Sequence, residues 1–283
     1  MMVRQIACRL AGSPDVYPVQ RCVPVRSINF VTSHDGFTLN DLVSYNQKHN
    51  EANGEHNRDG SNENYSWNCG IEGPSENVEV SELRTRQVKN FLVLMLLASG
   101  TPMLLMGDEV RRTQHGNNNG YCSDEAGAWF DWGAVEGRAD VHRFARELIG
   151  LRAGRRRSER CLRGSIGLRG VPRQMEWHGV RLREPDWSEQ SHSLAVRIAY
   201  ESGEIELYVI LNAYWEALTF ELPPLEEAVV WRRCVDTFRR VPEDICLGAD
   251  AQVVVTSSIL VQPRSIVVLV TADRSRPPTQ TSG

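Results

Sequence analysis

Two apolar runs in the first half of the chain end abruptly in polar residues. Residues 28–32 (INFVT) are apolar or β-branched nearly throughout and lead into the sequence SHDG, and residues 103–106 (MLLM) lead into GDE. Continuous apolar runs of this length are typical of parallel strands that are covered on both faces. The sequence therefore predicts two buried parallel strands, each followed by acidic residues.

The segment between these two runs has the periodicity of a helix. Apolar residues recur at helical spacing over residues 79–99, Gly100 stands where a helix C-cap belongs, and Pro102 prevents further extension. Strand, helix and strand in this order predict a right-handed crossover, which delivers the polar ends of both strands to the same rim. Weaker helical patterns predict short helices at residues 5–11, 38–45 and 141–152.

Asp35 is the first candidate for an active-site carboxylate, because barrels and open α/β sheets place their chemistry at the carboxyl ends of the strands. The alternative is a simple turn, in which the Asp hydrogen-bonds its own backbone and Gly36 takes a positive φ. Ser33, His34 and Asp35 do not make a nucleophilic triad, because consecutive residues cannot hydrogen-bond in that order. Asp108 and Glu109 at the second strand are either rim carboxylates or buried partners of Arg111 or Arg112.

Two polar loops follow the predicted strands. Residues 49–74 are rich in Asn, Glu and Gly, and residues 113–124 contain three consecutive Asn beside Tyr121. Tyr65 and Trp67 favour an ordered first loop, since Asn amides and aromatic faces suit a sugar-binding surface, whereas the alternative is a disordered insertion. In the second loop, Asn-Gly clusters also form ordinary turns.

From about residue 161 the pattern changes to short β runs. They span residues 194–200, 205–212, 218–222, 229–238, 253–261 and 265–271, and Ser202-Gly203 is typical of a hairpin turn. We expect a partial α/β barrel domain at residues 1–152, an antiparallel β-sandwich at 161–271 and a disordered tail at 272–283. The basic run formed by Arg152, Arg155, Arg156, Arg157 and Arg160 lacks interleaved aromatics and is interpreted as a solvated surface segment.

Composition excludes several classes of function. A net charge of -4 and a pI near 6.0 give no general attraction to nucleic acid or to an anionic membrane. The seven Cys are scattered without a CxxC pair, which argues against a zinc site and a disulfide scaffold and fits a cytoplasmic protein. Neither a signal peptide nor a membrane-spanning run is apparent. Basic charge is carried almost entirely by Arg, with Lys48 and Lys89 as the two lysines, and we interpret this as a compositional bias.

Several long motifs, in order, resemble the C-terminal half of glycogen-debranching enzymes of the isoamylase type, in the α-amylase superfamily (glycoside hydrolase family 13). The motifs are VRSINFVTSHDGFTLNDLVSYNQKHNEANGEHNRDG, SWNCGIEGP, GTPMLLMGDE, RTQHGNNNGYCSD and WFDW, with a weaker similarity in EPDWSEQSHSLAVRI. The resemblance implies that the two apolar runs are the seventh and eighth strands of a (β/α)8 barrel. An antiparallel β-sandwich domain then follows the C-terminal part of that barrel.

The resemblance also implies roles for individual residues. Family members retain anomeric configuration through a covalent glycosyl-enzyme intermediate, using an Asp nucleophile and a Glu acid/base about 5 Å apart. Asp35 matches the third carboxylate, which stabilises the oxocarbenium-like transition state, and His34 matches the histidine that hydrogen-bonds the same sugar. Asn117, Asn118 and Tyr121 lie in a loop that would shape the branch-accommodating pocket. The implied substrate is glycogen, another branched α-glucan or limit dextrin, and neither a redox cofactor nor a catalytic metal is implied.

The chain departs from the family pattern in two respects. The nucleophile and acid/base motifs lie upstream of the matched segments, and Arg111 stands where a small residue is expected after GDE. We therefore expect a fragment that exposes sheet edges and an apolar face, and that pairs with the missing N-terminal half of the enzyme. Two hypotheses follow, a partial debranching hydrolase and a non-catalytic α-glucan-binding remnant or subunit of a split enzyme.

Overall fold

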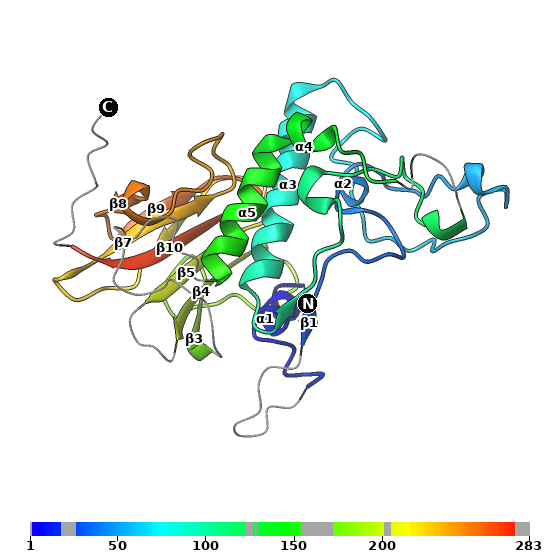
Figure 1. Cartoon of the computed structure of the whole chain (residues 1–283). Coiled ribbons are helices and arrows are strands. Elements are labelled where there is room, and N and C mark those ends of the chain that lie inside the picture. Colours follow the sequence, from blue (N-terminus) through cyan, green and yellow to red (C-terminus); the bar gives the residue numbers. More distant parts are fainter. Residues whose placement is uncertain are drawn as a thin grey trace, which may run out of the picture. The chain divides into compact units, whose positions relative to one another are not determined.

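The computed structural model describes residues 2–17, 27–122, 127, 129–153, 172–200 and 205–274 (Figure 1). The chain divides into two compact units, which we call the β unit and the loop unit. The β unit comprises Met1–Ser27, Leu96–Thr101 and Glu147–Gly283, and the loop unit comprises Ile28–Met95 and Pro102–Arg146.

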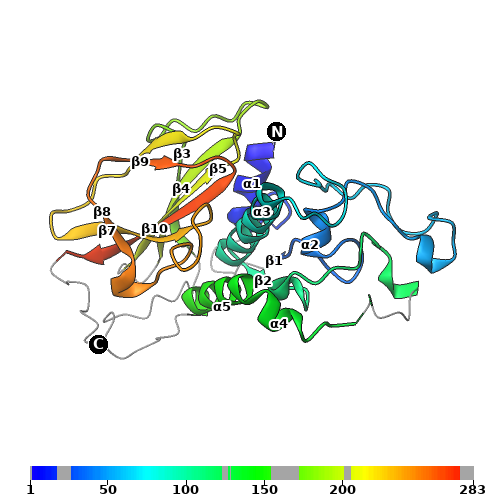
Figure 2. The same ribbon diagram turned by 90° about the horizontal axis from the view of Figure 1, so that it is seen from above.

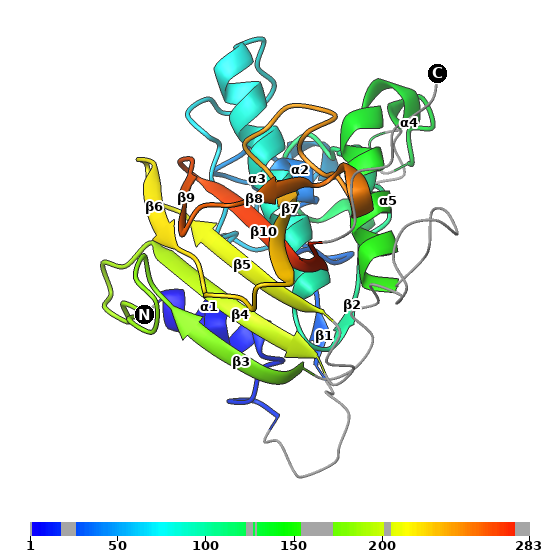
Figure 3. The same cartoon turned by 90° about the vertical axis from the view of Figure 1, so that its left-hand side faces the viewer.

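A six-stranded antiparallel sheet forms the centre of the β unit. Its strand order is β3 (Pro172–His178), β4 (Ser193–Tyr200), β5 (Glu206–Asn212), β10 (Ser265–Asp273), β7 (Val229–Asp236) and β8 (Gln252–Val254). A second antiparallel sheet pairs β6 (Leu218–Glu221) with β9 (Ser258–Val261). Figure 3 shows β3, β4, β5 and β10 as successive neighbours.

The core of the β unit lies between these two sheets. The large sheet contributes Ala195, Tyr208, Ile210, Trp231, Val267 and Leu269, while Phe220, Leu222 and Val261 come from the small sheet and its flanks. The two buried polar tips are satisfied, because Tyr208 Oη donates to Glu221 O at 3.1 Å and Trp231 Nε1 donates to Pro223 O at 3.0 Å. This arrangement confirms the predicted antiparallel β-sandwich.

Three details of the β prediction are wrong. The predicted strand over residues 253–261 is two strands, β8 and β9, which belong to different sheets, and Val255 between them is 83% exposed. The sequence pattern did not predict β3. The tail was predicted from residue 272, but Ala272 and Asp273 continue β10 and pair with Val230 and Val229.

Two other predictions concern residues outside the described ranges. Ser202-Gly203 lies there, although β4 and β5 on either side are antiparallel neighbours, and so do residues 275–283 of the tail.

Arg152 corrects the interpretation of the basic run. It lies in α5 (Ala139–Ala153) and is partly buried, with Nη1 donating to Ala98 O at 3.0 Å and to Leu96 O, and Nη2 donating to Gly100 O. Burial lowers the pKa of its guanidinium. Since the last carbonyls of a helix have no partners within the helix, Arg152 caps the carboxyl end of α3 (Val78–Leu97) instead of facing water. The other four arginines of the run lie outside the described residues.

The predicted helices are present, although α2 is shorter than the predicted 38–45 and α4 was not predicted. α2 (Leu39–Leu42) and α4 (Ala134–Gly137) lie in the loop unit and α1 (Met2–Leu10) lies in the β unit, while α3 (Val78–Leu97) and α5 begin in the loop unit and end in the β unit. Asn77 caps α3 through its Oδ1, which accepts the Val80 N–H at 3.1 Å, and Gly100 beyond its end has a φ of 121°. Helices α3 and α5 lie side by side (Figure 2), with Lys89 Nζ 5.4 Å from the centre of the Phe144 ring.

The two predicted buried strands are shorter and more exposed than expected. β1 spans Ile28–Asn29 and β2 spans Thr101–Pro102, two residues before the predicted run MLLM. Thr101 N donates to Ser27 O and Met103 N donates to Asn29 O, a constant offset that confirms the parallel direction.

The predicted burial is wrong, since Ile28 is 60% exposed, Phe30 54% and Met106 68%. Within the described residues β1 and β2 pair only with each other, so neighbouring strands do not cover these side chains. The barrel portion of the fold stays a prediction.

No helix in the described part of the chain combines the length and apolar character needed to cross a bilayer. A cytoplasmic location stays a prediction.

Candidate functional site

His34 and Asp35 lie on the loop that joins β1 to α2. Their side chains are 88% and 79% exposed, and His34 Nε2 lies 3.5 Å from Asp35 Oδ2. Gly36 has a φ of 91°, so the backbone bends directly after Asp35 as an Asp-Gly turn requires. The Gly36 N–H then donates to Asn118 O at 3.0 Å, which places Asp35 beside the second polar loop. Both alternatives for Asp35 are thus compatible, because the chain turns at Gly36 and the Asp35 carboxylate still faces solvent.

Asp108 closes the loop that carries this pair. It is 2% exposed, its Oδ1 accepts the Leu39 N–H at 2.9 Å, and its Oδ2 accepts the Thr32 hydroxyl. The two donors stand at either end of the His34–Asp35 loop. Burial raises the pKa of Asp108 to about 6, against the effect of these hydrogen bonds and of the charge of Arg112.

The other acidic and basic residues after β2 also bond locally. Glu109 Oε2 accepts the Gly107 N–H at 2.8 Å. Arg111 donates to Asn40 Oδ1 at 3.1 Å and to Thr85 Oγ1 at 2.8 Å, and burial lowers its pKa to about 10. Asp108 is thus a buried hydrogen-bond acceptor, as one alternative predicted; its oxygens accept the Thr32 hydroxyl and the Leu39 N–H, and of the two arginines named in that alternative Arg112 acts on it through its charge.

Asp41 links α2 to the second loop. Its side chain is fully buried, with Oδ1 accepting the Thr113 hydroxyl at 2.5 Å and Oδ2 accepting the Gln114 N–H at 2.7 Å. The Gly116 N–H lies 3.4 Å from the same Oδ2. A buried carboxylate that accepts several N–H and O–H groups fixes the backbone around it. Asp41 therefore sets the position of the second loop relative to the turn at Asp35.

A network of Asn side chains joins the two loops. Asn50 is fully buried, its Nδ2 donates to Asn118 Oδ1 at 2.9 Å, and its Oδ1 accepts the Asn118 N–H at 2.9 Å. Asn117 and Asn53 exchange hydrogen bonds through their amides. Asn53 and Asn119 both donate to Asp59 Oδ2, and these bonds lower the pKa of Asp59.

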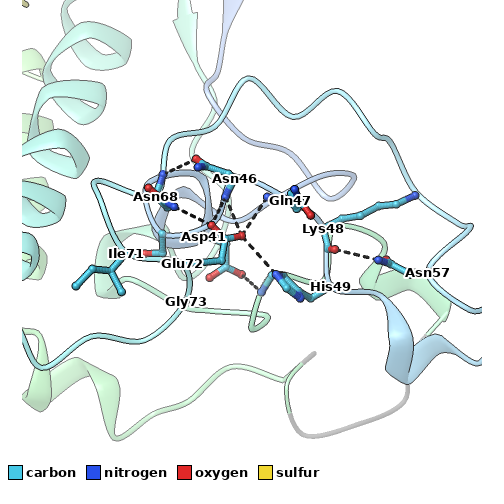
Figure 4. Close-up of polar contacts among 12 residues, drawn as sticks. Asp41, Asn46, Gln47, Lys48, His49, Asn57, Asn68, Ile71, Glu72 and Gly73 are labelled. Atoms are coloured by element: carbon cyan, nitrogen blue, oxygen red, sulfur yellow. Dashed lines mark hydrogen bonds and ion pairs between the residues drawn. The ribbon is translucent and has the colours of Figure 1, made fainter.

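Glu72 and Arg84 hold the two ends of the first loop together. Glu72 accepts the N–H groups of Asn46 and Gln47 and the Asn68 amide, and Figure 4 shows it between residues 46–49 and Asn68. Burial would raise the pKa of Glu72, but the hydrogen bonds from Asn46 and Asn68 outweigh it and lower the pKa. Arg84 of α3 donates to Gly73 O at 2.7 Å, to Asn68 O at 2.9 Å and to Ile71 O. The first loop is thus tied to itself and to α3.

The predicted substrate-binding residues fall into two groups. His34 and Tyr121 face solvent, with Tyr121 92% exposed. Asn117 and Asn118 are buried, and their amides are occupied by hydrogen bonds within the two loops; Asn118 Nδ2, for example, donates to Ser61 O at 2.7 Å. The Asn119 N–H donates to Asn117 Oδ1 at 2.9 Å, which is a local Asx turn. Substrate contact by any of the four stays a prediction.

Sequence reasoning missed Asp41, Glu72, Arg84 and Lys48 as organisers of this region. Asp41 had a recognisable signal, because it lies between Leu39 and Leu42 on a short helix preceded by Thr38, whose hydroxyl accepts the Asp41 N–H. Lys48 also had one, as a lysine in an arginine-rich chain. It is 8% exposed and donates to Asp59 O at 2.7 Å. Among the residues that the structure describes, no cluster of three or more His, Cys, Asp or Glu could hold a metal ion.

Comparisons with known proteins show which proteins this chain resembles. Residues 176–264 match the family model described as Isoamylase 1-3, C-terminal. The chain is 40% identical over 283 residues to the glycogen operon protein GlgX homolog of Mycobacterium bovis, covering 94% of this chain and 39% of that protein. It is 43% identical over 244 residues to the chloroplastic isoamylase 1 of Arabidopsis thaliana, covering 85% of this chain and 30% of that protein.

A solved structure shows the same fold at lower identity. The type I pullulanase of Bacillus subtilis, crystallised with maltose, has a TM-score of 0.60 and 22% sequence identity. The match covers 94% of this chain and 31% of that one. The chain thus spans between about three and four tenths of the length of these proteins.

Proposed function

We propose, from the premise that this chain is a relative of the isoamylase-type glycogen-debranching enzymes of the α-amylase superfamily, that it serves the hydrolysis of α-1,6 branch linkages in α-glucans. The substrate is glycogen, another branched α-glucan or limit dextrin, and the mechanism is the retaining one of the family. The observation that carries this proposal is the contact between Gly36 N–H and Asn118 O, which brings the exposed Asp35 beside an ordered polar loop. A cytoplasmic location accompanies it.

Asp35 acts in this proposal as the stabiliser of the transition state. An exposed carboxylate held at a tight turn can accept hydrogen bonds from two sugar hydroxyls and favour positive charge on the ring by electrostatics. His34, 3.5 Å away, donates to a hydroxyl of the same sugar. Asp108 fits neither nucleophile nor acid/base, because it is 2% exposed and its oxygens are occupied by Thr32 and Leu39.

The two loops shape the pocket for the branch. Tyr121 and Tyr65, 92% and 94% exposed, offer ring faces to sugars. Asn117 and Asn118 act on the substrate through the shape of the loop, since their amides hold the loops together. Preorganised loops of this kind spare the ligand the entropy of ordering them.

The nucleophile and the acid/base come, in this proposal, from a polypeptide segment other than these 283 residues. Of the three carboxylates that follow β1 and β2, Asp35 alone is largely exposed, and the family's nucleophile and acid/base motifs are absent. Ile28, Phe30 and Met106 form exposed apolar surface on the same unit, which such a segment would cover.

Two assays test the proposal. The purified chain is expected to release no linear chains from amylopectin, and release by the chain alone would remove the need for a second segment. A longer form that carries the missing carboxylates is expected to debranch amylopectin and to lose turnover in Asp35→Asn with its melting temperature unchanged. The control is Glu63→Gln, an exposed carboxylate of the first loop. Near-normal rates for Asp35→Asn would remove Asp35 from the catalytic set.

The second candidate is α-glucan binding without chemistry. It is favoured by exposed Tyr65 and Tyr121 beside a loop pair that lacks the nucleophile motif. The coding sequence next to this chain separates the two candidates, because an adjacent or in-frame segment with the missing Asp and Glu supports the hydrolase. Absence of such a segment supports the binding protein.

A further inference from the structure

The β unit carries an exposed aromatic cluster that the proposed function does not use. Tyr214 and Trp215, in the loop between β5 and β6, stack with ring centres 3.9 Å apart and planes inclined by 32°. His192, directly before β4, lies edge-on to Trp215 at 5.8 Å and 6.2 Å from Tyr214. Trp215 is nevertheless 54% exposed. Much of the indole is therefore open to solvent, even though Tyr214 and His192 both pack against it.

The loop that presents these rings is rigidly held. Asn212 is 1% exposed, and its Nδ2 donates to Glu216 O at 2.8 Å and to Val261 O at 3.0 Å. Its Oδ1 accepts the Tyr214 N–H at 3.0 Å, while the Arg264 N–H donates to Tyr214 O at 3.0 Å. A buried amide that satisfies both sides of a short loop fixes the backbone and hence the rings on it.

His192 adds a polar group at the edge of the cluster. Its Nδ1 lies within hydrogen-bond distance of Gln190 O, and a carbonyl only accepts, so Nδ1 carries the proton. In the neutral ring the Nε2 atom is therefore an acceptor. A flat apolar face beside a hydrogen-bond acceptor suits a pyranose ring, which has an apolar face and a rim of hydroxyl donors.

We propose that His192, Tyr214 and Trp215 form an additional binding site for a linear segment of α-glucan on the β unit. The identity of the sugar polymer rests on the proposed function, whereas the site itself rests on the geometry of the three rings. The residues beside them in sequence, Ala213 and Glu216, are exposed and are small or charged. One partly exposed indole with such neighbours is too small for a stable protein interface, which buries about 800 Å² on each partner. A site of this kind retains the polymer through a surface that takes no part in bond cleavage.

Affinity electrophoresis of the purified full chain tests the site. Native gels that contain amylose or glycogen retard a protein that binds them, and gels that contain hydroxyethyl cellulose control for the type of linkage. We expect Trp215→Ala to raise the apparent dissociation constant for amylose by about tenfold. Trp215→Phe, which keeps a ring, should restore part of the retardation. The matched control is Leu260→Ala on β9, because Leu260 is apolar and 55% exposed in the same unit.

The outcomes separate this site from the proposed function. Retardation of Asp35→Asn equal to that of the unaltered chain, together with its loss in Trp215→Ala, supports the site whether or not any form of the protein cleaves branches. Equal retardation of Trp215→Ala and the unaltered chain overturns the site and leaves the debranching proposal standing. No retardation of the unaltered chain also overturns it. If Trp215→Ala lost binding to a protein partner and kept its binding to amylose, the rings would belong to a protein interface and the sugar site would be overturned.

Discussion

Asp41 Oδ2 lies 2.7 Å from the backbone N of Gln114, although 73 residues separate the two in sequence. Three residues upstream of α2, the Gly36 N–H reaches Asn118 O in the same second loop. One short helix thus fixes the distance between the turn at Asp35 and the residues that follow Gln114. In the proposed enzyme, the geometry around Asp35 therefore depends on Asp41, a buried residue that has no contact with the sugar.

We predict that Asp41→Ala destabilises the protein by about 2–4 kcal/mol, because it leaves the partly buried Thr113 hydroxyl and Gln114 N–H without an acceptor. Hydrogen exchange monitored by mass spectrometry should show faster exchange at residues 113–118 than in the unaltered chain. Asp41→Asn keeps one acceptor oxygen, so its exchange rate at these residues should lie between those of Asp41→Ala and the unaltered chain. Unchanged exchange at Gln114 in Asp41→Ala would contradict the role of Asp41 in holding the loop.

Asp108 predicts a dependence of stability on pH. Burial raises its pKa from 3.8 to about 6 in the folded chain, so between these values the folded state binds more protons than the unfolded state. The contribution of this group to stability is therefore largest below about pH 4 and falls as the pH rises to about 6. The full span is at most about 3 kcal/mol, since one pKa unit corresponds to about 1.4 kcal/mol.

Asp108→Asn isolates this contribution. Asn keeps an acceptor for the Leu39 N–H, and its amide can donate to the Thr32 hydroxyl, so the fold is retained. Urea unfolding at pH 4.5 and pH 7 should give a smaller fall in the free energy of unfolding for Asp108→Asn than for the unaltered chain. A fall of the same size in both proteins would assign the pH dependence to other groups.

The hydrogen bonds of Arg84 lead to a prediction about the stability of the first loop. Arg84→Met should free residues 68–73 from α3, because the carbonyl oxygens of Asn68, Ile71 and Gly73 lose their charged donor. Limited proteolysis should then cut within residues 61–74 while the β unit stays intact. The control is Arg58→Met, since Arg58 is exposed and its side chain bonds only to Glu55 in the described structure. Equal protection of both variants would show that Glu72 suffices to hold the loop.

The elements that periodicity predicted best are those whose cores lie within their own unit. Residues 79–99 repeat apolar positions at helical spacing, and α3 accordingly buries Val88, Leu92 and Val93 completely or nearly so. The β runs likewise alternate or run apolar around the sandwich core. The prediction that Ile28 and Phe30 are buried failed for a physical reason. An apolar run indicates that a strand needs neighbours on both faces, and in the described residues β1 pairs only with β2.

Sequence patterns did not reveal the network that orders the two loops. A single Asn-rich stretch is compatible with turns, sugar contacts or disorder, and only pairing at long range separates them, as when Asn50 meets Asn118. The positions of the two lysines indicated buried sites, whereas we interpreted them only as a compositional bias. Lys48 and Lys89 are 8% and 4% exposed, so both sites use a compact charge in buried surroundings while arginine carries the basic charge elsewhere.

Arg152 provides a test of the correction to the basic run. If its guanidinium caps the end of α3 through Ala98 O and Gly100 O, Arg152→Met should lower the free energy of unfolding of the β unit by about 2–3 kcal/mol, because buried carbonyls lose a charged donor. Arg152→Lys should recover only part of this loss, since one ammonium cannot reproduce the spacing of the two Nη donors. Chemical unfolding followed by tryptophan fluorescence measures both variants. A solvated Arg152 would instead give changes within about 0.5 kcal/mol, the range typical of surface substitutions.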